Sequence, residues 1–513
     1  MFSTCFANTL HRFTGVVCHV ERRAFCIKAD NFTLSNYGSF NPQLGATLHQ
    51  LDSLAPRFEI KSSQIEILDH PDDFYTTLKN KIRAAQSRVF LSSLYIGNHQ
   101  NELVACIADA MQKTPKLQVK ILLDCLRSTR DSPDDSTASL LAPLVSRFGD
   151  RIDVRLYHTP KLHGLLKMLI PKRFNEGFGL QHMKIYGFDD QVMLSGANLS
   201  QDYFTNRQDR YYIFSSKPMS DYYLGVQDAV SSLSYQLLPA DNKQKYLLRW
   251  NSSNKASEPL LNVERYIKDC NRVLNPVLKS HCGSTLLELH ETAPDTVVYA
   301  VSSFTPLLEP DFSTEKPAIL RILSFLDDKS ASFTFTAGYF NMHRDILDRI
   351  CHSQASGNII TAAPEANSFY KSKGVSRYVP PAYLYNAKKF LEKVTKAGRG
   401  DKVRLLEWQN GIIHQPNGWS YHAKGIWINL PGESEPSITV IGSSNYTKRA
   451  YSLDLEINAI VITKDSELKA KMKKEVDHLC KHTSVMTLKD FQRHDRHISP
   501  GVKVAATVLG NML

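Results

Sequence analysis

An internal repeat constrains the fold of this chain more than any other feature of its sequence. Residues 182–209 and residues 422–456 both open with His-x-Lys, continue as two apolar strands separated by a turn, and close with an Asn and then an acid. The Asn and the acid are 11 positions apart in both segments. Between His and Asn, the second segment has an insertion at residues 431–437, whose composition is typical of a turn. The sequence therefore predicts two copies of one domain.

The repeat extends upstream of these segments, and strand-like runs alternate with helical stretches in both copies. The paired runs are 89–99 with 333–343, 119–125 with 358–364, and 154–157 with 403–406; the helical stretches are 73–87, 102–113 and 382–396. Strands that alternate with helices predict an α/β sandwich in each copy. We place the first domain at residues 60–245, a connecting segment of helix and strand at 246–315, the second domain at 316–485 and a carboxyl-terminal tail at 486–513.

The charge balance indicates anionic partners. The 513 residues carry a formal charge of +11, which suits nucleic acid, an anionic membrane surface or phosphorylated substrates. The apolar runs are of strand length, so no membrane-spanning helix is predicted. The nine cysteines show no Cys-x-x-Cys spacing, which argues against a zinc ribbon or a disulfide framework and favours a reducing compartment.

The amino terminus has the pattern of a targeting segment. Residues 1–20 contain no acid and place apolar side chains three or four positions apart, as on one face of a helix. With Arg12 and the basic residues that follow, this pattern predicts a transit peptide within a flexible leader that extends to residue 55, and it favours the mitochondrion. A frayed amino-terminal helix is the alternative.

Each His-x-Lys pair is suited to chemistry at a phosphate. Residues i and i+2 of a strand point to the same face, so His182 lies beside Lys184 and His422 beside Lys424. An imidazole can attack phosphorus or carry a proton near neutral pH, and a neighbouring ammonium stabilises the charge that builds up on the phosphate oxygens.

The residues that close each repeat can complete such a site. The amides of Asn198 and Asn445 can donate hydrogen bonds to a phosphate. The carboxylates of Asp209 and Glu456 can accept from the far nitrogen of an imidazole, which would fix its tautomer and raise its basicity.

The double pattern resembles the phospholipase D superfamily, whose motif is His-x-Lys followed by an Asp five positions after the Lys, then Gly-Ser-x-Asn and an acid. In the first copy His182, Lys184 and Asp189 match, with the sequence SGAN at 195–198. The second copy has GSSN at 442–445, but Asn429 stands where the motif has Asp. Within the superfamily, residues 171–189, 195–212, 417–427 and 440–456 look like the eukaryotic mitochondrial phosphatidylglycerophosphate synthases.

The resemblance implies a fold, a reaction and a location. The fold would be two phospholipase D-like α/β sandwich domains related by a pseudo-twofold axis, with the active site at their interface. The reaction would transfer a phosphatidyl group from CDP-diacylglycerol to glycerol 3-phosphate, without a metal or other cofactor. The enzyme would be peripheral to an anionic membrane, on the matrix side of the inner mitochondrial membrane, and no nucleic-acid partner is expected.

The resemblance also assigns roles to residues. His182 would form the phosphatidyl-histidine, whereas His422 would serve as general acid and then as base; from the sequence alone these two roles are interchangeable. Lys184, Lys424 and Asp189 would complete the catalytic set. Asn429 would fill a hydrogen-bonding role in its strand, so we expect the second copy to be functional.

Two further groups of residues have alternative interpretations. Residues 161–174 combine apolar and basic side chains and are either a bilayer contact or a core helix ended by Pro171. Cations near the motifs are either phosphate ligands or members of structural salt bridges; they are Arg207, Arg210, Lys448 and Arg449.

Three other functions are compatible with the pattern. A phosphodiesterase or nuclease of the same superfamily would also use a basic cleft. Cardiolipin or phosphatidylserine synthesis would use the same chemistry with another acceptor. A membrane adaptor with a decayed second site is suggested by Asn429, although both histidines, both lysines and both acids are present.

Overall fold

The computed structural model describes residues 42–130, 135–170, 172–279, 294–496 and 498–508. Contacts divide the chain between residues 45 and 46, and residues 46–513 form one compact unit, called the second unit below. The predicted transit peptide lies outside the described residues. Apart from residues 42–45, which begin a helix, everything that follows concerns the second unit.

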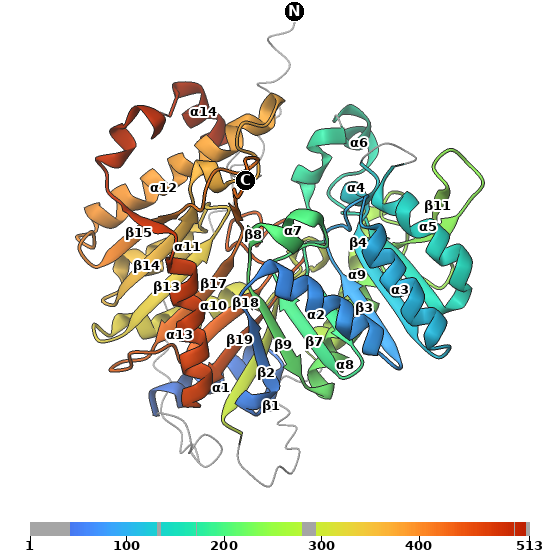
Figure 1. Ribbon diagram of the computed structural model, residues 1–513, viewed down its shortest axis with the longest axis horizontal. Coiled ribbons are helices and arrows are strands. Elements are labelled where there is room, and N and C mark those ends of the chain that lie inside the picture. The colour runs from blue at the N-terminus through green and yellow to red at the C-terminus, as the bar shows by residue number, and fades with distance from the viewer. Residues whose placement is uncertain (1–41, 131–134, 171, 280–293, 497, 509–513) are drawn as a thin grey trace, which may run out of the picture. The chain divides into compact units, whose positions relative to one another are not determined.

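The second unit is built on two nine-stranded mixed sheets (Figure 1). In spatial order, the first sheet is β11 (Tyr246–Arg249), β10 (Tyr235–Pro239), β5 (Ile152–Tyr157), β4 (Gln118–Asp124), β3 (Arg88–Ser92), β6 (Ile185–Phe188), β7 (Gln191–Ser195), β9 (Tyr211–Ser215) and β2 (Ile65–Leu68). The second sheet is β20 (Thr483–Met486), β15 (Val403–Trp408), β14 (Ser356–Ala362), β13 (Ser332–Ala337), β17 (Lys424–Asn429), β18 (Ile438–Gly442), β19 (Glu456–Thr463), β12 (Thr296–Ser303) and β1 (Arg57–Ile60).

The central six strands follow the same order in both sheets. β5-β4-β3-β6-β7-β9 in the first corresponds to β15-β14-β13-β17-β18-β19 in the second. The first three strands of each set are parallel, and the next strand, β6 or β17, then runs antiparallel to its neighbour. β17 begins with Lys424, and β6 begins directly after Lys184. The three pairs of upstream runs matched in the sequence are β3 with β13, β4 with β14 and β5 with β15, which confirms the prediction of two related α/β halves.

Helices cover both faces of the sheets. They are α1 (Pro42–Leu54), α2 (Pro71–Ala84), α3 (Asn101–Lys113), α4 (Cys125–Ser128), α5 (Thr137–Phe148), α6 (Gly164–Leu169), α7 (Gln201–Thr205), α8 (Lys217–Ser231), α9 (Val263–Leu278), α10 (Glu315–Ile322), α11 (Arg344–His352), α12 (Val379–Lys396), α13 (Ser466–Cys480) and α14 (Pro500–Val508). The three predicted helical stretches are α2, α3 and α12.

Alternating side chains of the first sheet pack into two separate hydrophobic cores. Val89 and Leu91 pack with α2, α3 and α5, whereas Phe90 and Leu122 pack with α8 and α9. The second core continues into β12 and β19 of the other sheet. The two halves therefore share one hydrophobic core, which explains why residues 46–513 behave as a single compact unit.

The predicted domain boundaries need correction. The connecting segment 246–315 supplies the edge strand β11 to the first sheet and the fully buried strand β12 to the interior of the second. β1 precedes the first half in sequence but belongs to the second sheet. The leader also ends earlier than residue 55, because Leu48 and Leu51 of α1 are buried. Hydrogen-bonded strand partners far apart in sequence, rather than local composition, set these boundaries.

A buried ion pair joins the two halves. Arg210, which precedes β9, donates to both carboxylate oxygens of Glu475 on α13, at 2.7 and 3.1 Å, and to the carbonyl of Val440 at 2.6 Å. Its guanidinium also lies over the ring of Trp427, 3.8 Å from the centroid. Arg210 is thus a structural residue, and its predicted alternative as a phosphate ligand is wrong.

No helix in the described ranges has both the length and the hydrophobicity needed to cross a bilayer.

This pair gives a prediction about stability. Replacing Glu475 with Ala leaves the Arg210 charge buried and uncompensated, so the free energy of unfolding should fall by about 3–5 kcal/mol. Urea unfolding followed by circular dichroism measures the change. Asp477→Ala on the same helix breaks an exposed pair with Lys473 and should change the stability by less than about 0.5 kcal/mol. Equal effects of the two substitutions would contradict the assignment.

Candidate active site between the two halves

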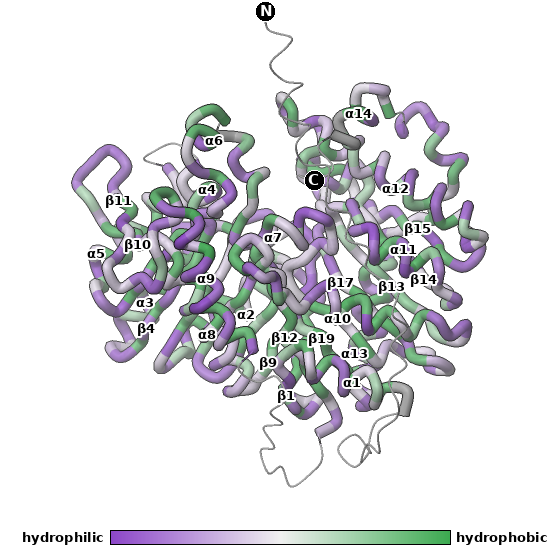
Figure 2. The backbone as a smooth tube through the Cα atoms, turned by 180° about the vertical axis from the view of Figure 1, so that it is seen from behind, coloured by the Kyte–Doolittle hydropathy of each residue, from purple (hydrophilic) through white to green (hydrophobic). Residues whose placement is uncertain are grey.

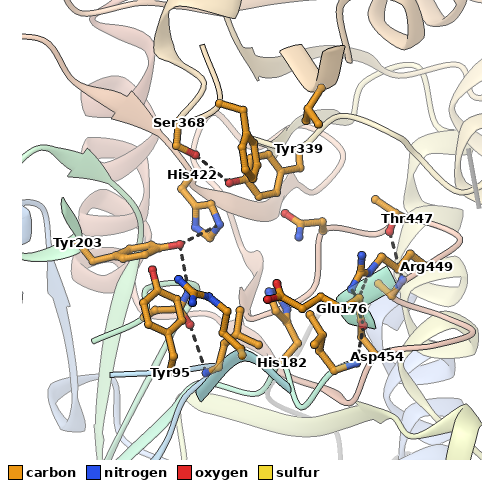
Figure 3. Close-up of a pocket in the computed structure, with 18 of the residues that line it drawn as sticks. Tyr95, Glu176, His182, Tyr203, Tyr339, Ser368, His422, Thr447, Arg449 and Asp454 are labelled. Atoms are coloured by element: carbon orange, nitrogen blue, oxygen red, sulfur yellow. Dashed lines mark hydrogen bonds and ion pairs between the residues drawn. The ribbon is translucent and has the colours of Figure 1, made fainter. Parts of the chain in front are cut away.

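Both histidines of the repeat open into one cavity of about 420 Å³ (Figure 3). Both halves of the protein line it. The lining residues include His182, Asn198, Tyr203 and Arg207 from the first half, and Tyr339, His422, Asn445, Arg449, Asp454 and Glu456 from the second. A cavity of this size and polarity suits a small phosphorylated headgroup.

The backbone of each histidine is held by the other half. The amide of His182 donates to the carbonyl of Leu455 at 3.0 Å, and the amide of His422 donates to the carbonyl of Gln208 at 2.8 Å. Leu455 and Gln208 are the residues just before the acids of the two repeats. The short parallel pairing of β16 (Ser420–Tyr421) with β8 (Arg207–Gln208) belongs to the same crossing.

The side chains cross in the same way. Nδ1 of His182 donates to Glu456 at 2.8 Å, and Nδ1 of His422 donates to Asp209 at 2.6 Å. The structure therefore places each acid against the histidine of the opposite copy. With the proton on Nδ1, the Nε2 lone pair of each ring is the one available for chemistry.

The two lysines lie beside the rings and are buried. The Nζ atoms of Lys184 and Lys424 each donate to the carbonyl of the histidine two residues before, at 2.7 Å in both cases. Burial lowers the pKa of Lys184 to about 7 and that of Lys424 to about 8, whereas Glu456 and Asp209 act in the opposite direction. Binding of an anionic substrate would raise both pKa values again.

Burial also determines the direction of the pKa shifts of the two histidines. It lowers the pKa of His182 and of His422 well below the usual range, and the adjacent lysines act in the same direction. Desolvation therefore opposes the increase in basicity that we expect from the acids, and that increase stays a prediction. Both rings are neutral at neutral pH, the state in which Nε2 can attack phosphorus or accept a proton.

One tyrosine makes the two histidines unequal. The hydroxyl of Tyr203 donates to Nε2 of His422 at 3.3 Å and accepts from the amide of Asn198 at 3.1 Å. Counting five positions from Asn445, as from Asn198 to Tyr203, the second copy has Ala450. No residue of the described chain makes a hydrogen bond to Nε2 of His182, and its side chain is 12% exposed against 3% for His422.

A reversed ion pair adds to this asymmetry. Asp202 pairs with Arg207 at 2.9 Å, and at the equivalent positions of the second copy Arg449 pairs with Asp454 at 2.8 Å. Arg207 and Asp454, the second residues of these pairs in sequence, each bind the residue that lies two positions before the histidine of the other copy. Arg207 donates to the hydroxyl of Ser420 at 3.0 Å, and Asp454 accepts from the amide of Leu180 at 2.9 Å.

The predicted catalytic assignment of Asp189 is corrected. Asp189 occupies the turn after β6 with a positive φ of 48° and does not line the cavity. Its carboxylate accepts from the amides of Gln86, Ser87 and Arg88 at 2.8–3.0 Å, which fixes the start of β3. Asn429 in the second copy donates to the carbonyl of Ser434 in its own, longer turn. Neither residue can reach a substrate, because both lie at the far ends of their strands.

The predicted phosphate ligands differ in whether they line the cavity. Asn198 and Asn445 both line the cavity, but the Asn198 amide is directed at Tyr203. Arg207 and Arg449 also line it, whereas Lys448 does not.

Sequence reasoning missed several cavity residues. Among them are Tyr95, Arg127, Arg130, Glu176, Tyr203 and Tyr339. Tyr95 and Tyr339 had a signal, since they occupy the same position of the paired runs 89–99 and 333–343, and Tyr203 lies between the Asn and the acid of the first motif. Arg127, Arg130 and Glu176 lie outside the repeated segments, so no spacing rule selects them.

Comparison with known proteins identifies the family. Residues 322–480 match the family model described as cardiolipin synthase, PLD-like domain. A protein of Saccharomyces cerevisiae named CDP-diacylglycerol–glycerol-3-phosphate 3-phosphatidyltransferase is 48% identical over 492 residues, covering 93% of each chain. This chain belongs to the CDP-diacylglycerol–glycerol-3-phosphate 3-phosphatidyltransferase family.

Other members of this phosphatidyltransferase family match over most of their length. The chicken protein, named as mitochondrial, is 34% identical over 92% of this chain and 88% of its own. The human protein, also named as mitochondrial, is 32% identical over 90% of this chain and 84% of its own. A solved phosphatidylserine synthase of Haemophilus influenzae has a TM-score of 0.69 and 19% identity, and it covers 92% of this chain and 100% of that one. That likeness bears on the fold alone and agrees with two phospholipase D-like halves.

The close packing around Lys424 gives a prediction. A Cβ atom at Gly196 would lie 2.5 Å from the Asp209 carboxylate and 2.8 Å from Nζ of Lys424. Gly196→Ala should therefore displace the groups that hold His422 and lower turnover by about 100-fold, with the fold retained. The control is Gly225→Ala in α8, where the added Cβ would meet only Val277 at 3.9 Å. Unchanged turnover in Gly196→Ala would contradict the described geometry.

Proposed function

We propose that this protein transfers the phosphatidyl group of CDP-diacylglycerol to glycerol 3-phosphate through a phosphatidyl-histidine on His182. The observation that carries the proposal is the unequal environment of two otherwise equivalent histidines in one cavity. His182 lines the cavity and its Nε2 has no hydrogen bond within the described residues, whereas Nε2 of His422 accepts a hydrogen bond from the hydroxyl of Tyr203. Family membership supports this reaction over the nuclease, adaptor and other-acceptor alternatives.

In the first step, Nε2 of His182 attacks the phosphorus on the lipid side of the pyrophosphate. The new P–N bond forms as the P–O bond to CMP breaks. Glu456 stabilises the positive charge that develops on the His182 ring through the 2.8 Å hydrogen bond to Nδ1. The bound pyrophosphate raises the pKa of His422, which then carries the proton that it gives to the departing CMP oxygen.

In the second step, His422 acts as a base. Its Nε2 takes the proton from a hydroxyl of glycerol 3-phosphate, and the hydroxyl oxygen attacks the phosphorus as the P–N bond to His182 breaks. Asp209 holds the Nδ1 proton of His422 throughout. The products are phosphatidylglycerophosphate and a regenerated His182.

Cationic side chains of the protein supply the charge that this chemistry needs. Lys184 and Lys424 lie beside the reacting rings, and four arginines line the cavity: Arg127, Arg130, Arg207 and Arg449. Guanidinium groups suit paired phosphate oxygens, so we assign them to the CDP and glycerol phosphates together with Asn198 and Asn445. The reaction is accordingly proposed to need no metal ion.

We further propose that the protein acts as a peripheral enzyme at the matrix face of the inner mitochondrial membrane. The vertebrate relatives are named as mitochondrial. The basic, acid-free amino-terminal segment is compatible with import into the organelle. The net charge of +11 favours an anionic membrane surface.

The test is CMP release from cytidine-labelled CDP-diacylglycerol in the presence of EDTA, with and without glycerol 3-phosphate. Wild-type protein should release CMP in an acceptor-dependent manner, and His182→Ala should lose this activity by at least about 10⁴-fold. Gly225→Ala is the matched control and should keep full activity. Release that needs an added divalent ion, or that survives in His182→Ala, would contradict the proposal.

A further inference from the structure

The helix α6 exposes large apolar side chains to solvent. Leu165, Met168 and Leu169 are 74%, 81% and 78% exposed, and Leu166 is also exposed. Figure 2 shows hydrophobic residues along α6. The alternative of a core helix is therefore wrong for residues 161–174. A cluster of exposed large apolar residues on a single short segment usually marks a binding surface.

A second exposed segment from the other half has the same character. Phe369, Val375 and Tyr378 are exposed, and Val375 and Tyr378 belong to the short helix η8 (Gly374–Tyr378) that leads into α12. Sequence periodicity gave no sign of this segment, because its apolar residues follow neither a helical nor a strand spacing.

Both segments are basic and free of acids. Residues 161–174 contain three lysines and one arginine, and residues 369–378 contain two lysines and one arginine; neither contains Asp or Glu. Apolar side chains interleaved with cations are typical of surfaces that lie in the headgroup layer of an anionic membrane.

The two segments border the same cavity. Glu176, two residues after Phe174, lines it from the first half. Ser368, Phe369 and Val379, at the two ends of the second segment, line it from the other half. We name residues 161–170 and 369–378 together the docking rim. The rim is assembled only by the folded pair of halves, because its members are about 200 residues apart in sequence.

We propose that the docking rim seats on an anionic bilayer, with the mouth of the catalytic cavity facing the lipid headgroups. The inference rests on the proposed function, because a diacylglycerol substrate has to reach the cavity from a membrane. The apolar side chains enter the acyl boundary, the cations contact the lipid phosphates, and the substrate headgroup enters between the two segments. Because both halves contribute to the rim, the cavity is held over the membrane in one orientation. A single anchoring helix would not fix that orientation.

The binding test uses vesicles of phosphatidylcholine with phosphatidylglycerol, and vesicles of phosphatidylcholine alone. Leu165→Glu/Leu169→Glu and Val375→Glu/Tyr378→Glu, as two separate double variants, should each weaken cosedimentation with the anionic vesicles by about tenfold or more. Wild-type protein should bind the neutral vesicles much less. Unchanged binding by either double variant would overturn the proposal for that segment.

The matched control is Leu261→Glu/Val485→Glu. These side chains are exposed and apolar like those of the rim, but they neither line the cavity nor lie in the two segments. The control should bind vesicles as wild type does. An equal loss of binding in the control would overturn the proposal, since any added acid would then suffice. A change in oligomeric mass with unchanged vesicle binding would assign the rim to contacts between copies of the chain, and would also overturn it.

An activity measurement separates docking from catalysis. On a dispersed, short-chain CDP-diacylglycerol, the rim variants should keep the wild-type turnover, while on vesicle-embedded long-chain substrate they should lose at least about tenfold. Loss on the dispersed substrate as well would show that the residues serve the fold or the reaction, against the proposal. Failure of the proposed function itself would be seen separately, as absent CMP release by wild-type protein, because vesicle binding needs no turnover.

Discussion

Each reactive histidine is held by the half of the protein to which it does not belong. The backbone of His182 is bound by Leu455 and its ring by Glu456, and the backbone of His422 is bound by Gln208 and its ring by Asp209. Burying two imidazoles, two ammonium groups and two carboxylates is costly unless each group has a partner. The partners exist only when the halves are joined, so the shared core and the Arg210–Glu475 pair serve the chemistry as well as stability.

The two copies build the site in the same way, but small sequence differences between them give the two histidines different roles. Where the second copy has Ser443 donating to Glu456, the first has Gly196, which leaves room for Asp209 and Lys424. Where the first copy has Tyr203 over His422, the second has Ala450. A two-step displacement needs one ring that can reach phosphorus and one that exchanges a proton, and these substitutions provide one of each.

Much of the fold could be predicted from the sequence, because the repeat shows which strands of the two halves are equivalent. β3, β4 and β5 are matched correctly with β13, β14 and β15. Both histidines and Glu456 of the motifs line one cavity, and the two lysines and Asp209 contact those histidines. The crossing of the acids could not be predicted, since spacing along the chain does not show which copy a side chain faces. Asp189 was misassigned for a related reason, because a motif records that a residue belongs to the pattern without telling whether it faces the substrate or supports a turn.

The central claim is that His182, and not His422, carries the covalent intermediate. The most direct test is to mix the protein with CDP-diacylglycerol without acceptor, quench rapidly, and locate the phosphatidyl adduct by peptide mass spectrometry under alkaline conditions that preserve P–N bonds. The account predicts an adduct on the peptide that contains His182, which disappears when glycerol 3-phosphate is added. An adduct on the His422 peptide, or CMP release in the complete reaction with no adduct on either histidine, would contradict it.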